Sequence, residues 1–464
     1  MLVSIGELNV GARKAFAFTP ETENTPEGAV VFTFYDGSPR LGRRDFLRVG
    51  SLALGGLTLS DLLATRAAAG DKRPVTDKSV IFLFMHGGPS QIETFDPKMT
   101  APAGIRSATG EIATRSPGIT FGSTFEKLAA LSDRFSVVRS FQTGNGKHDI
   151  KPIVCSDTAD ANIGSLFARI AGTNDPHTGM PTNVALYPRA VDPETRPTTM
   201  NFGKFESTGP LGAAYAPFVP SSGGAQANLK LAIPRDRLDD RRSLLTQLDN
   251  VKRAADNGQL SGLGRFQQQA FETIVGGVAD AFDLSKEDSK TVALYDTAPL
   301  VRPDQISRKW NNYNNYVDNA KSLGKLLLMA RRLCESGCGF VTITTNFVWD
   351  MHSDKNNAGV EEGMQYMGKP FDHAVSAFLQ DVDARGLGDK IALVACGEMG
   401  RTPKINARGG RDHWGGLAPL LLAGGGLNRG QVVGQSSSDA GKPHTTPVTI
   451  PNLVATLMHT LLDV

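Results

Sequence analysis

Short apolar runs recur along the chain from about residue 75 onward, separated by longer segments with helical periodicity. Residues 79–85 (SVIFLFM) form an almost continuous apolar run, which is the pattern of a strand buried on both faces. Similar but shorter runs predict further strands at 340–344, 391–395 and 418–423, with weaker candidates at 135–138 and 184–186. These runs are far too short to be helices of a hydrophobic core, so they indicate a sheet.

Two segments between these runs predict helices. In residues 313–334 one face carries Leu323, Leu326, Leu327, Ala330 and Leu333, and Gly337 ends the pattern. In residues 374–382 apolar positions again recur at helical spacing, and Gly386 ends the helix. Alternation of strand and helix predicts an α/β fold, a doubly wound and mostly parallel sheet with helices on both faces.

The middle of the chain departs from this alternation. Residues 201–224 are rich in Gly, Pro and Ser and predict a loop, whereas residues 238–284 look helical and could form a cap beside the sheet. We therefore expect one α/β domain over 75–464, with a helical and loop insertion at about 200–310.

A basic and then apolar segment precedes this domain. Arg43 and Arg44, Phe-Leu, an apolar stretch and three alanines at 67–69 resemble a twin-arginine export signal over 43–70. The alternative is a basic turn before a buried helix. Residues 1–42 are expected to be a disordered extension. The longest apolar run, 49–63, contains Asp61 and falls short of the roughly 18–20 residues of a membrane span. These features predict the export machinery as a partner, a periplasmic or cell-envelope location, and no stable membrane span.

Composition and charge exclude several classes of protein. The 464 residues are 40% hydrophobic and 21% charged, which excludes a wholly disordered chain, and the formal net charge of +2 makes no case for nucleic acid as a partner. Four cysteines without CxxC spacing form neither a disulfide scaffold nor a zinc ribbon. Of these, Cys334 and Cys338 could pack in the core or form a disulfide after export.

Candidate metal ligands follow or precede the predicted strands. Ligands of open parallel sheets bind beyond the carboxyl ends of the strands. Imidazole and carboxylate groups there suit a divalent metal, zinc or manganese rather than copper. The alternative for each residue taken singly is an ordinary hydrogen-bonded side chain, and we assign that role to the remaining histidines 177, 373, 444 and 459. The candidates at strand ends are His86, Asp350, His352, Glu398, Asp412 and His413.

Beyond the candidate metal ligands, the sequence offers little evidence for a particular chemistry. Arg401 could clamp a sulfate or phosphate group, because a guanidinium donates in a fork that matches such oxygens, or it could be an ordinary surface arginine. The sequence contains no GxxxxGK[ST] phosphate loop, no GxSxG nucleophile elbow and no HExxH helix. It also shows no dinucleotide fingerprint, so redox chemistry on such a cofactor is disfavoured.

The motifs taken together resemble the domain of unknown function 1501 family, exported proteins related to sulfatases within the alkaline phosphatase-like superfamily. The matching segments are RRDFLR in the leader, HGGPSQIETFDPK from His86, NIGSLFARIAG from Asn162, AFDLS from Ala281, ARRLCESGCGFVTI from Ala330, WDMHSD from Trp349, GEMGRTPKINARGGRDHWG from Gly397 and LLLAGGGLNRGQVVG from Leu420. The resemblance implies a doubly wound α/β fold and a metal site.

The resemblance also implies roles for individual residues. Asp350 and His352 match the superfamily's loop pair, Glu398 its strand-end acid and His413 its late histidine. Where the superfamily has an acid after the first strand, this chain has His86, which leaves open a single-metal site or one with altered ligands. Zinc is the expected metal, with manganese or calcium as alternatives.

No residue fits the sulfatase nucleophile motif, CxPxR, because neither Cys155 nor Cys396 has the required neighbours. Superfamily phosphatases instead use Ser or Thr, and Thr143 within SFQTGNGKH occupies about the right place. Ser90 is a second candidate, and His148 is a candidate ligand or general acid. Each could equally be an ordinary structural side chain.

These observations predict an exported, metal-dependent hydrolase of sulfate or phosphate esters, acting on a small molecule or a polysaccharide. The alternative is a non-catalytic protein that keeps the fold to bind an anionic polysaccharide in the cell envelope. A third hypothesis is a purely structural role in the envelope, with neither metal nor ligand.

Overall fold

A computed structural model describes residues 6–10, 13–17, 74–220 and 278–463 of the chain. Two compact units divide it at Gly50 and Ser51. In the first unit, β1 (Gly6–Val10) and β2 (Arg13–Ala17) pair as an antiparallel hairpin. The predicted export signal lies outside the described residues, so export and the boundaries of the leader stay predictions.

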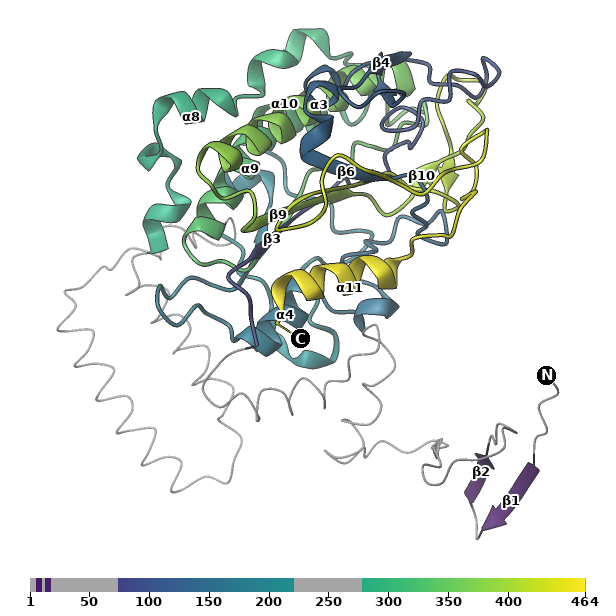
Figure 1. The fold of residues 1–464 in the computed structure, drawn as a ribbon. Coiled ribbons are helices and arrows are strands. Elements are labelled where there is room, and N and C mark those ends of the chain that lie inside the picture. The colour runs from purple at the N-terminus through teal and green to yellow at the C-terminus, as the bar shows by residue number, and fades with distance from the viewer. Residues whose placement is uncertain (1–5, 11–12, 18–73, 221–277, 464) are drawn as a thin grey trace. The chain divides into compact units, whose positions relative to one another are not determined.

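The second unit is built around a seven-stranded sheet (Figure 1). In spatial order its strands are β13 (Val432–Val433), β6 (Phe135–Val138), β12 (Leu420–Gly424), β9 (Ile391–Cys396), β3 (Ser79–Phe84), β8 (Phe340–Thr344) and β7 (Asn183–Leu186). Strands β9, β3, β8 and β7 run parallel, β13 runs parallel to β6, and β12 runs antiparallel to both of its neighbours. The predicted α/β fold with a mostly parallel sheet is confirmed.

Strand β3 lies inside this sheet, between β9 and β8, and is buried along its whole length. Side chains alternate across a strand, so its apolar run serves two hydrophobic cores. Ile81 and Leu83 belong to one core, whereas Val80, Phe82 and Phe84 belong to the other. This explains why the run shows no polar alternation.

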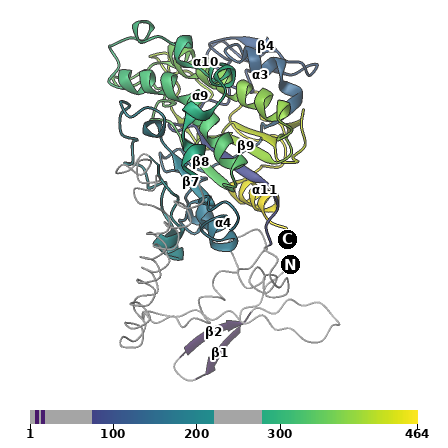
Figure 2. The ribbon, with the colours of Figure 1, turned by 90° about the vertical axis from the view of Figure 1, so that its left-hand side faces the viewer.

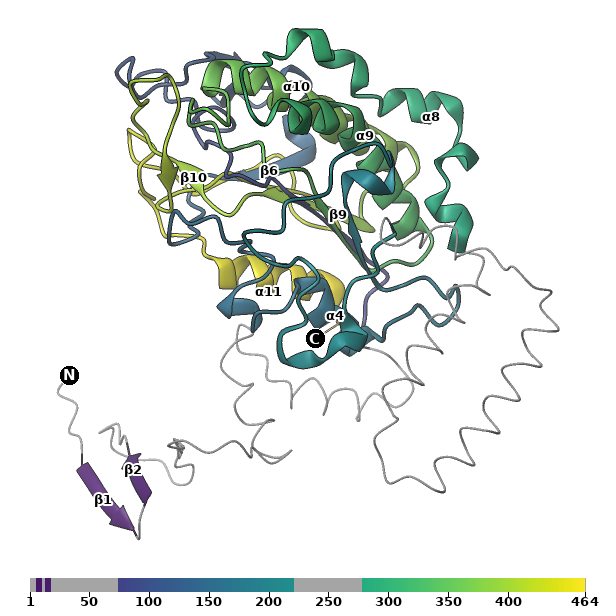
Figure 3. The same cartoon turned by 180° about the vertical axis from the view of Figure 1, so that it is seen from behind.

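Helices cover both faces of the sheet (Figure 1 and Figure 3). One face carries α3 (Glu126–Ala130), α9 (Tyr313–Glu335) and α10 (Val360–Ala384). The other carries α4 (Ile163–Ala171) and α11 (Ile450–Leu461), and a view from the side shows the two layers (Figure 2). The predicted helix at 313–334 matches α9, but α10 begins at Val360, well before the predicted start at 374. Among the described residues, no helix combines the length and apolar content needed to cross a bilayer.

Smaller elements flank the sheet. Two short hairpins pair β4 (Glu111–Ala113) with β5 (Thr120–Gly122) and β10 (Gly400–Arg401) with β11 (His413–Trp414). After residue 277 the chain forms short 3-10 turns and α8 (Ser289–Leu294). The predicted helical cap at 238–284 falls mostly outside the described residues, so that part of the insertion is untested.

Candidate metal centre

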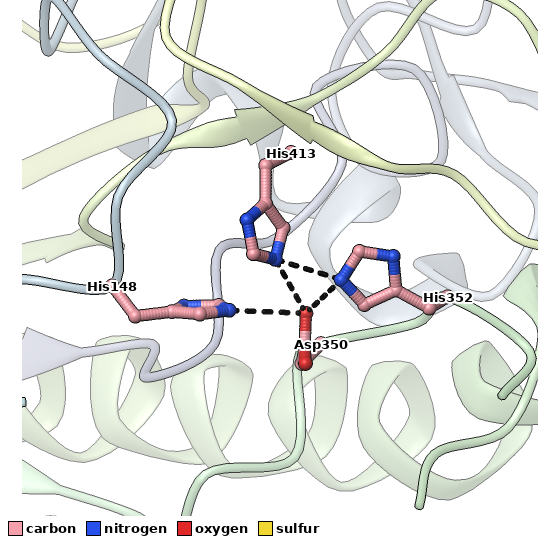
Figure 4. A group of neighbouring side chains, drawn as sticks. All are labelled: His148, Asp350, His352 and His413. Carbon is pink, nitrogen blue, oxygen red and sulfur yellow. Dashed lines mark hydrogen bonds and ion pairs between the residues drawn. The ribbon is translucent and has the colours of Figure 1, made fainter. Parts of the chain in front are cut away.

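Three connections at one edge of the sheet bring four polar side chains together. His148 comes from the connection after β6, Asp350 and His352 from the connection after β8, and His413 from β11. One donor atom of each lies within 4.8 Å of the others, and the three imidazole rings surround the Asp350 carboxylate (Figure 4). Segments far apart in sequence thus converge on one point.

Asp350 is the centre of this group. Its Oδ1 lies 2.9 Å from Nε2 of His352, 3.3 Å from Nε2 of His413 and 3.4 Å from Nε2 of His148. Arg401 Nη2 also contacts Oδ1, at 2.5 Å. Burial by itself would raise the pKa of this carboxyl. The Arg401 charge and the three imidazole nitrogens facing Oδ1 outweigh burial and hold the pKa far below its ordinary value, so Asp350 is an anion.

Two further carboxylates lie behind the imidazoles. Glu398 Oε1 is 2.9 Å from His148 Nδ1, and Asp412 Oδ1 is 3.0 Å from His352 Nδ1. A carboxylate accepts only, so each of these Nδ1 atoms is placed to carry the ring proton and its Nε2 to present a lone pair to the centre. This is the arrangement by which proteins orient metal-ligating histidines.

Two nitrogen atoms at the centre lie so close that they must share either a proton or a metal ion. Nε2 of His352 lies 2.7 Å from Nε2 of His413, and His352 Nε2 already accepts from Arg401 Nη1 at 3.3 Å. Two imidazole lone pairs cannot face each other at this distance without a proton or metal to share. Burial, opposed by the neighbouring Asp350 carboxylate, lowers the pKa of His413, which favours its neutral, ligating form.

Distances and charge both fit one divalent metal. Ligand atoms about 2.05 Å from a tetrahedral zinc would be about 3.3 Å apart, close to the separations around Asp350 Oδ1. Asp350, Glu398 and Asp412 set three negative charges against the one positive charge of Arg401. The resulting formal charge of −2 balances a divalent ion. A metal would therefore be held by Asp350, His148, His352 and His413.

The other predicted ligands lie around this group in different roles. Glu398 accepts from the Gly87 backbone N–H as well as facing His148, and Asp412 also accepts from Asn406. Both carboxylates orient histidines in this structure, and direct ligation by them stays a prediction. The sequence left His148 open between ligand and general acid, and the structure groups it with the ligand atoms.

Arg401 is fully buried and uses all five N–H groups within the protein. Its Nε donates to Gly88 O, Nη1 donates to Arg411 O and His352 Nε2, and Nη2 donates to Gly87 O and Asp350 Oδ1. Pairing of β10 with β11 sets Arg401 opposite His413. The predicted clamp on a substrate anion remains untested, and it would require Arg401 to release one of these acceptors.

The two candidate nucleophiles lie in different surroundings. Ser90 Oγ accepts from the backbone N–H groups of Ile92 and Glu93, at 3.2 Å and 3.3 Å, so it stabilises a turn. Thr143 is buried, and its Oγ1 has no hydrogen-bond partner among the described residues. The segment after Thr143 contacts the His413 strand, because Gly144 N–H donates to Gly415 O. Neither nucleophile role is tested by this arrangement.

His86 is separate from the ligand group and lies among aromatic rings. It is fully buried, neither ring nitrogen has a hydrogen-bond partner among the described residues, and the rings around it are Phe84, Phe202, Phe205 and Phe347. Burial, opposed by the nearby Glu398 charge, lowers its pKa to about 4. His86 is therefore neutral at pH 7, and ligation by it stays a prediction.

We expect His86 to make stability pH-dependent. The unfolded imidazole takes up a proton near pH 6.5, whereas the buried one resists until about pH 4. Stability contributed by His86 is thus present above pH 6.5 and falls by about 3 kcal/mol as the pH drops to 4. Urea unfolding of chelator-treated protein at several pH values, compared with His86→Phe, measures this loss.

His86→Phe replaces one ring by another within the aromatic group and should flatten the profile between pH 4 and 6.5. The exposed His444→Phe serves as the matched control and should leave the profile as in the wild type. If the free energy of unfolding changed with pH in the same way for the wild type and for His86→Phe, the prediction would be contradicted. An unchanged metal content in His86→Phe would also show that His86 is not a ligand.

Comparison with known proteins gives a family and distant structural likenesses. The profile of a family described as "Protein of unknown function (DUF1501)" matches residues 77–463. No curated protein matches the sequence. Among solved structures, the PsFucS1 sulfatase from Pseudoalteromonas sp. is 9% identical with a TM-score of 0.35, and the match covers 86% of this chain and 70% of that one.

Two further structures show similar levels of likeness. Ps i-CgsB in complex with k-i-k-neocarrahexaose is 13% identical with a TM-score of 0.30, over 83% of this chain and 72% of that one. The alkaline phosphatase from the Antarctic bacterium TAB5 is 12% identical with a TM-score of 0.28, over 82% and 97%. At these scores the function has to be argued from the site itself.

Proposed function

The chain belongs to the DUF1501 family of proteins of unknown function, and we propose that it is a metal-dependent hydrolase of sulfate or phosphate esters. The observation that carries the proposal is the convergence of three imidazole Nε2 atoms on the Asp350 carboxylate. Two of these imidazoles are backed by carboxylates, which is the chemistry of a site built for a divalent cation.

Each residue has a defined part in this proposal. A bound divalent metal supplies Lewis-acid polarisation of an ester oxygen. Arg401 keeps Asp350 ionised, so that the carboxylate stays available as a ligand. Glu398 and Asp412 hold the protons of His148 and His352 at Nδ1, which keeps both Nε2 atoms free to ligate.

The number of protein ligands favours a second candidate function. Structural zinc sites have four protein ligands, whereas catalytic sites keep one position open for water or substrate. Four donor atoms converge here, so the metal could stabilise the fold of a non-catalytic protein that binds anionic polysaccharide. Substitution with cobalt(II) distinguishes the two, because its absorption spectrum reports four-coordinate against five-coordinate geometry.

Metal content tests the site directly. Protein purified without chelator is expected to contain about one divalent ion per chain, and His352→Ala is expected to lose most of it, because one of four ligands is removed. Elemental analysis measures both. The control is the exposed His444→Ala, which should retain the metal. A folded wild type without metal would refute the proposal.

An assay panel then separates the hydrolase from the binding protein. Metal-loaded wild type is expected to hydrolyse at least one aryl sulfate or aryl phosphate, and His352→Ala should be inactive on the same compound. Metal-loaded protein that binds sulfated polysaccharide but turns over no ester would favour the second function.

Export forms a separate part of the proposal and rests on the paired arginines at 43 and 44. Replacing both by lysine should retain the full-length protein in the cytoplasmic fraction, since the twin-arginine pathway reads that pair. Cell fractionation with immunoblotting measures this. Unchanged distribution between fractions would refute export by that route.

A further inference from the structure

Two phenylalanine rings are stacked beside the metal centre. Phe202 and Phe347 have ring centroids 4.7 Å apart with an interplanar angle of 29°. The His148 ring lies 4.5 Å from the Phe347 ring and 5.1 Å from the Phe202 ring. His148 is one of the four converging side chains, so this aromatic pair adjoins the centre directly.

This pair borders the buried His86 on one side but lies outside the two hydrophobic cores. Phe202 and Phe347 are only half-buried, and neither belongs to the hydrophobic cores on the two faces of the sheet. The rings that complete those cores nearby, Phe84 and Phe205, are fully buried. A half-exposed aromatic surface beside a polar centre leaves apolar area in water, which a bound apolar group would remove.

Polar residues flank Phe202 and His148 in the sequence. Asn201 and Lys204 flank Phe202, and Asn145 and Lys147 precede His148, all four being exposed. An aromatic surface whose sequence neighbours carry exposed amide and ammonium groups suits a ligand that has a flat apolar face and polar or anionic substituents. This is the shape of an ester whose alcohol part is a ring.

We propose that the Phe202–Phe347 pair is a subsite for a six-membered ring, aryl or pyranose, in the alcohol part of the ester. The inference rests on the proposed function, because the anionic group of the same ligand would be held at the metal. The ring would then lie against the aromatic pair next to His148. Specificity would thus be for cyclic rather than linear or very small alcohols.

Non-hydrolysable ligands test the subsite without turnover. Calorimetry on metal-loaded protein compares methyl-, n-hexyl-, cyclohexyl- and phenylphosphonate, a sugar phosphonate, and the corresponding sulfonates. We expect the best ring-bearing ligand to bind about tenfold more tightly than the methyl compound, as stacking on an aromatic ring would give. Whether the phenyl or the sugar compound shows this gain identifies the kind of ring.

Variants locate the effect. Phe202→Ala and Phe347→Ala should each remove most of the preference for the ring while leaving metal content and methylphosphonate affinity unchanged. The control is Phe218→Ala, another half-buried phenylalanine, which lies beside the amino end of β7 and packs against Phe282. Phe218→Ala should keep the full preference for ring-bearing ligands over the methyl compound.

The outcomes separate the two proposals. Equal binding of methyl and ring-bearing ligands, or an n-hexyl compound that binds as tightly as the ring, would overturn the subsite while the metallohydrolase stands. Loss of methylphosphonate affinity in Phe202→Ala would overturn it as well. Absence of metal, or no binding of any phosphonate or sulfonate by metal-loaded wild type, would refute the proposed function and the subsite with it.

Discussion

Asp350→Asn is expected to abolish both metal binding and turnover while leaving the protein folded. The carboxylate is the one anion at the centre, and three imidazole nitrogens lie within 3.4 Å of its Oδ1. An amide oxygen is a much weaker metal ligand, so we expect metal affinity to fall by more than the roughly 10–100-fold that loss of a supporting hydrogen bond causes. Elemental analysis and the ester assay measure the two losses.

The asparagine variant is chosen because its amide oxygen can still accept from Arg401, which alanine could not. Asp389→Asn is the matched control, since Asp389 is highly exposed and pairs only with Arg429 in the described structure. It should retain metal and activity. If Asp350→Asn bound metal as tightly as the wild type, the centre would have to lie elsewhere, with Glu398 or Asp412 as ligands.

Breaking the buried Glu93–Arg411 pair is expected to produce the largest loss of stability. Arg411 Nη2 and Nε lie 2.8 Å and 3.0 Å from Glu93 Oε1, and both side chains are completely buried. Glu93→Leu would leave the Arg411 charge uncompensated in the interior, which costs about 3–5 kcal/mol. Urea unfolding measures the change in the free energy of unfolding.

The same pair positions the metal centre. Glu93 accepts from Ser107 and the backbone N–H groups of Ala108 and Thr109, and Arg411 directly precedes Asp412 and His413. Glu93→Leu should therefore also weaken metal binding, which a remote stability defect would not do. Adding Arg411→Met should recover part of the stability, because no unpaired charge remains. If Glu93→Leu alone were as stable as the wild type, the prediction would be contradicted.

The strands were predictable because their positions depend on local apolar runs. Residues 79–85 and 391–395 are buried on both faces, so every position except Ser79 is apolar and the pattern is clear. The first half of α10 was missed because Gly363, Gly368 and Pro370 disfavour a helix in isolation. Packing against α9, as between Tyr316 and Tyr366, stabilises that half in the folded chain.

The sequence identified several residues of the candidate site but not which of them face the centre and which orient a histidine. Placement at strand ends identified Asp350, His352 and His413 as candidates, since those ends meet at one edge of the sheet. Whether a carboxylate ligates or orients a histidine depends on which imidazole nitrogen faces inward, and spacing in sequence does not encode that. Glu93, Arg411, Phe202 and Phe347 gave no signal, because their roles arise from contacts between distant loops.

The spacing of the four donors along the chain has a consequence for how the proposed metal would be acquired. The four donors span residues 148 to 413, so the group is complete only once the connections after β6 and β8 and strand β11 have come together. Loops of such length close late, after most of the sheet has assembled. Partly folded chains would therefore hold no complete site. A nearly native protein would then select the ion, so the metal content would reflect the compartment in which folding finishes.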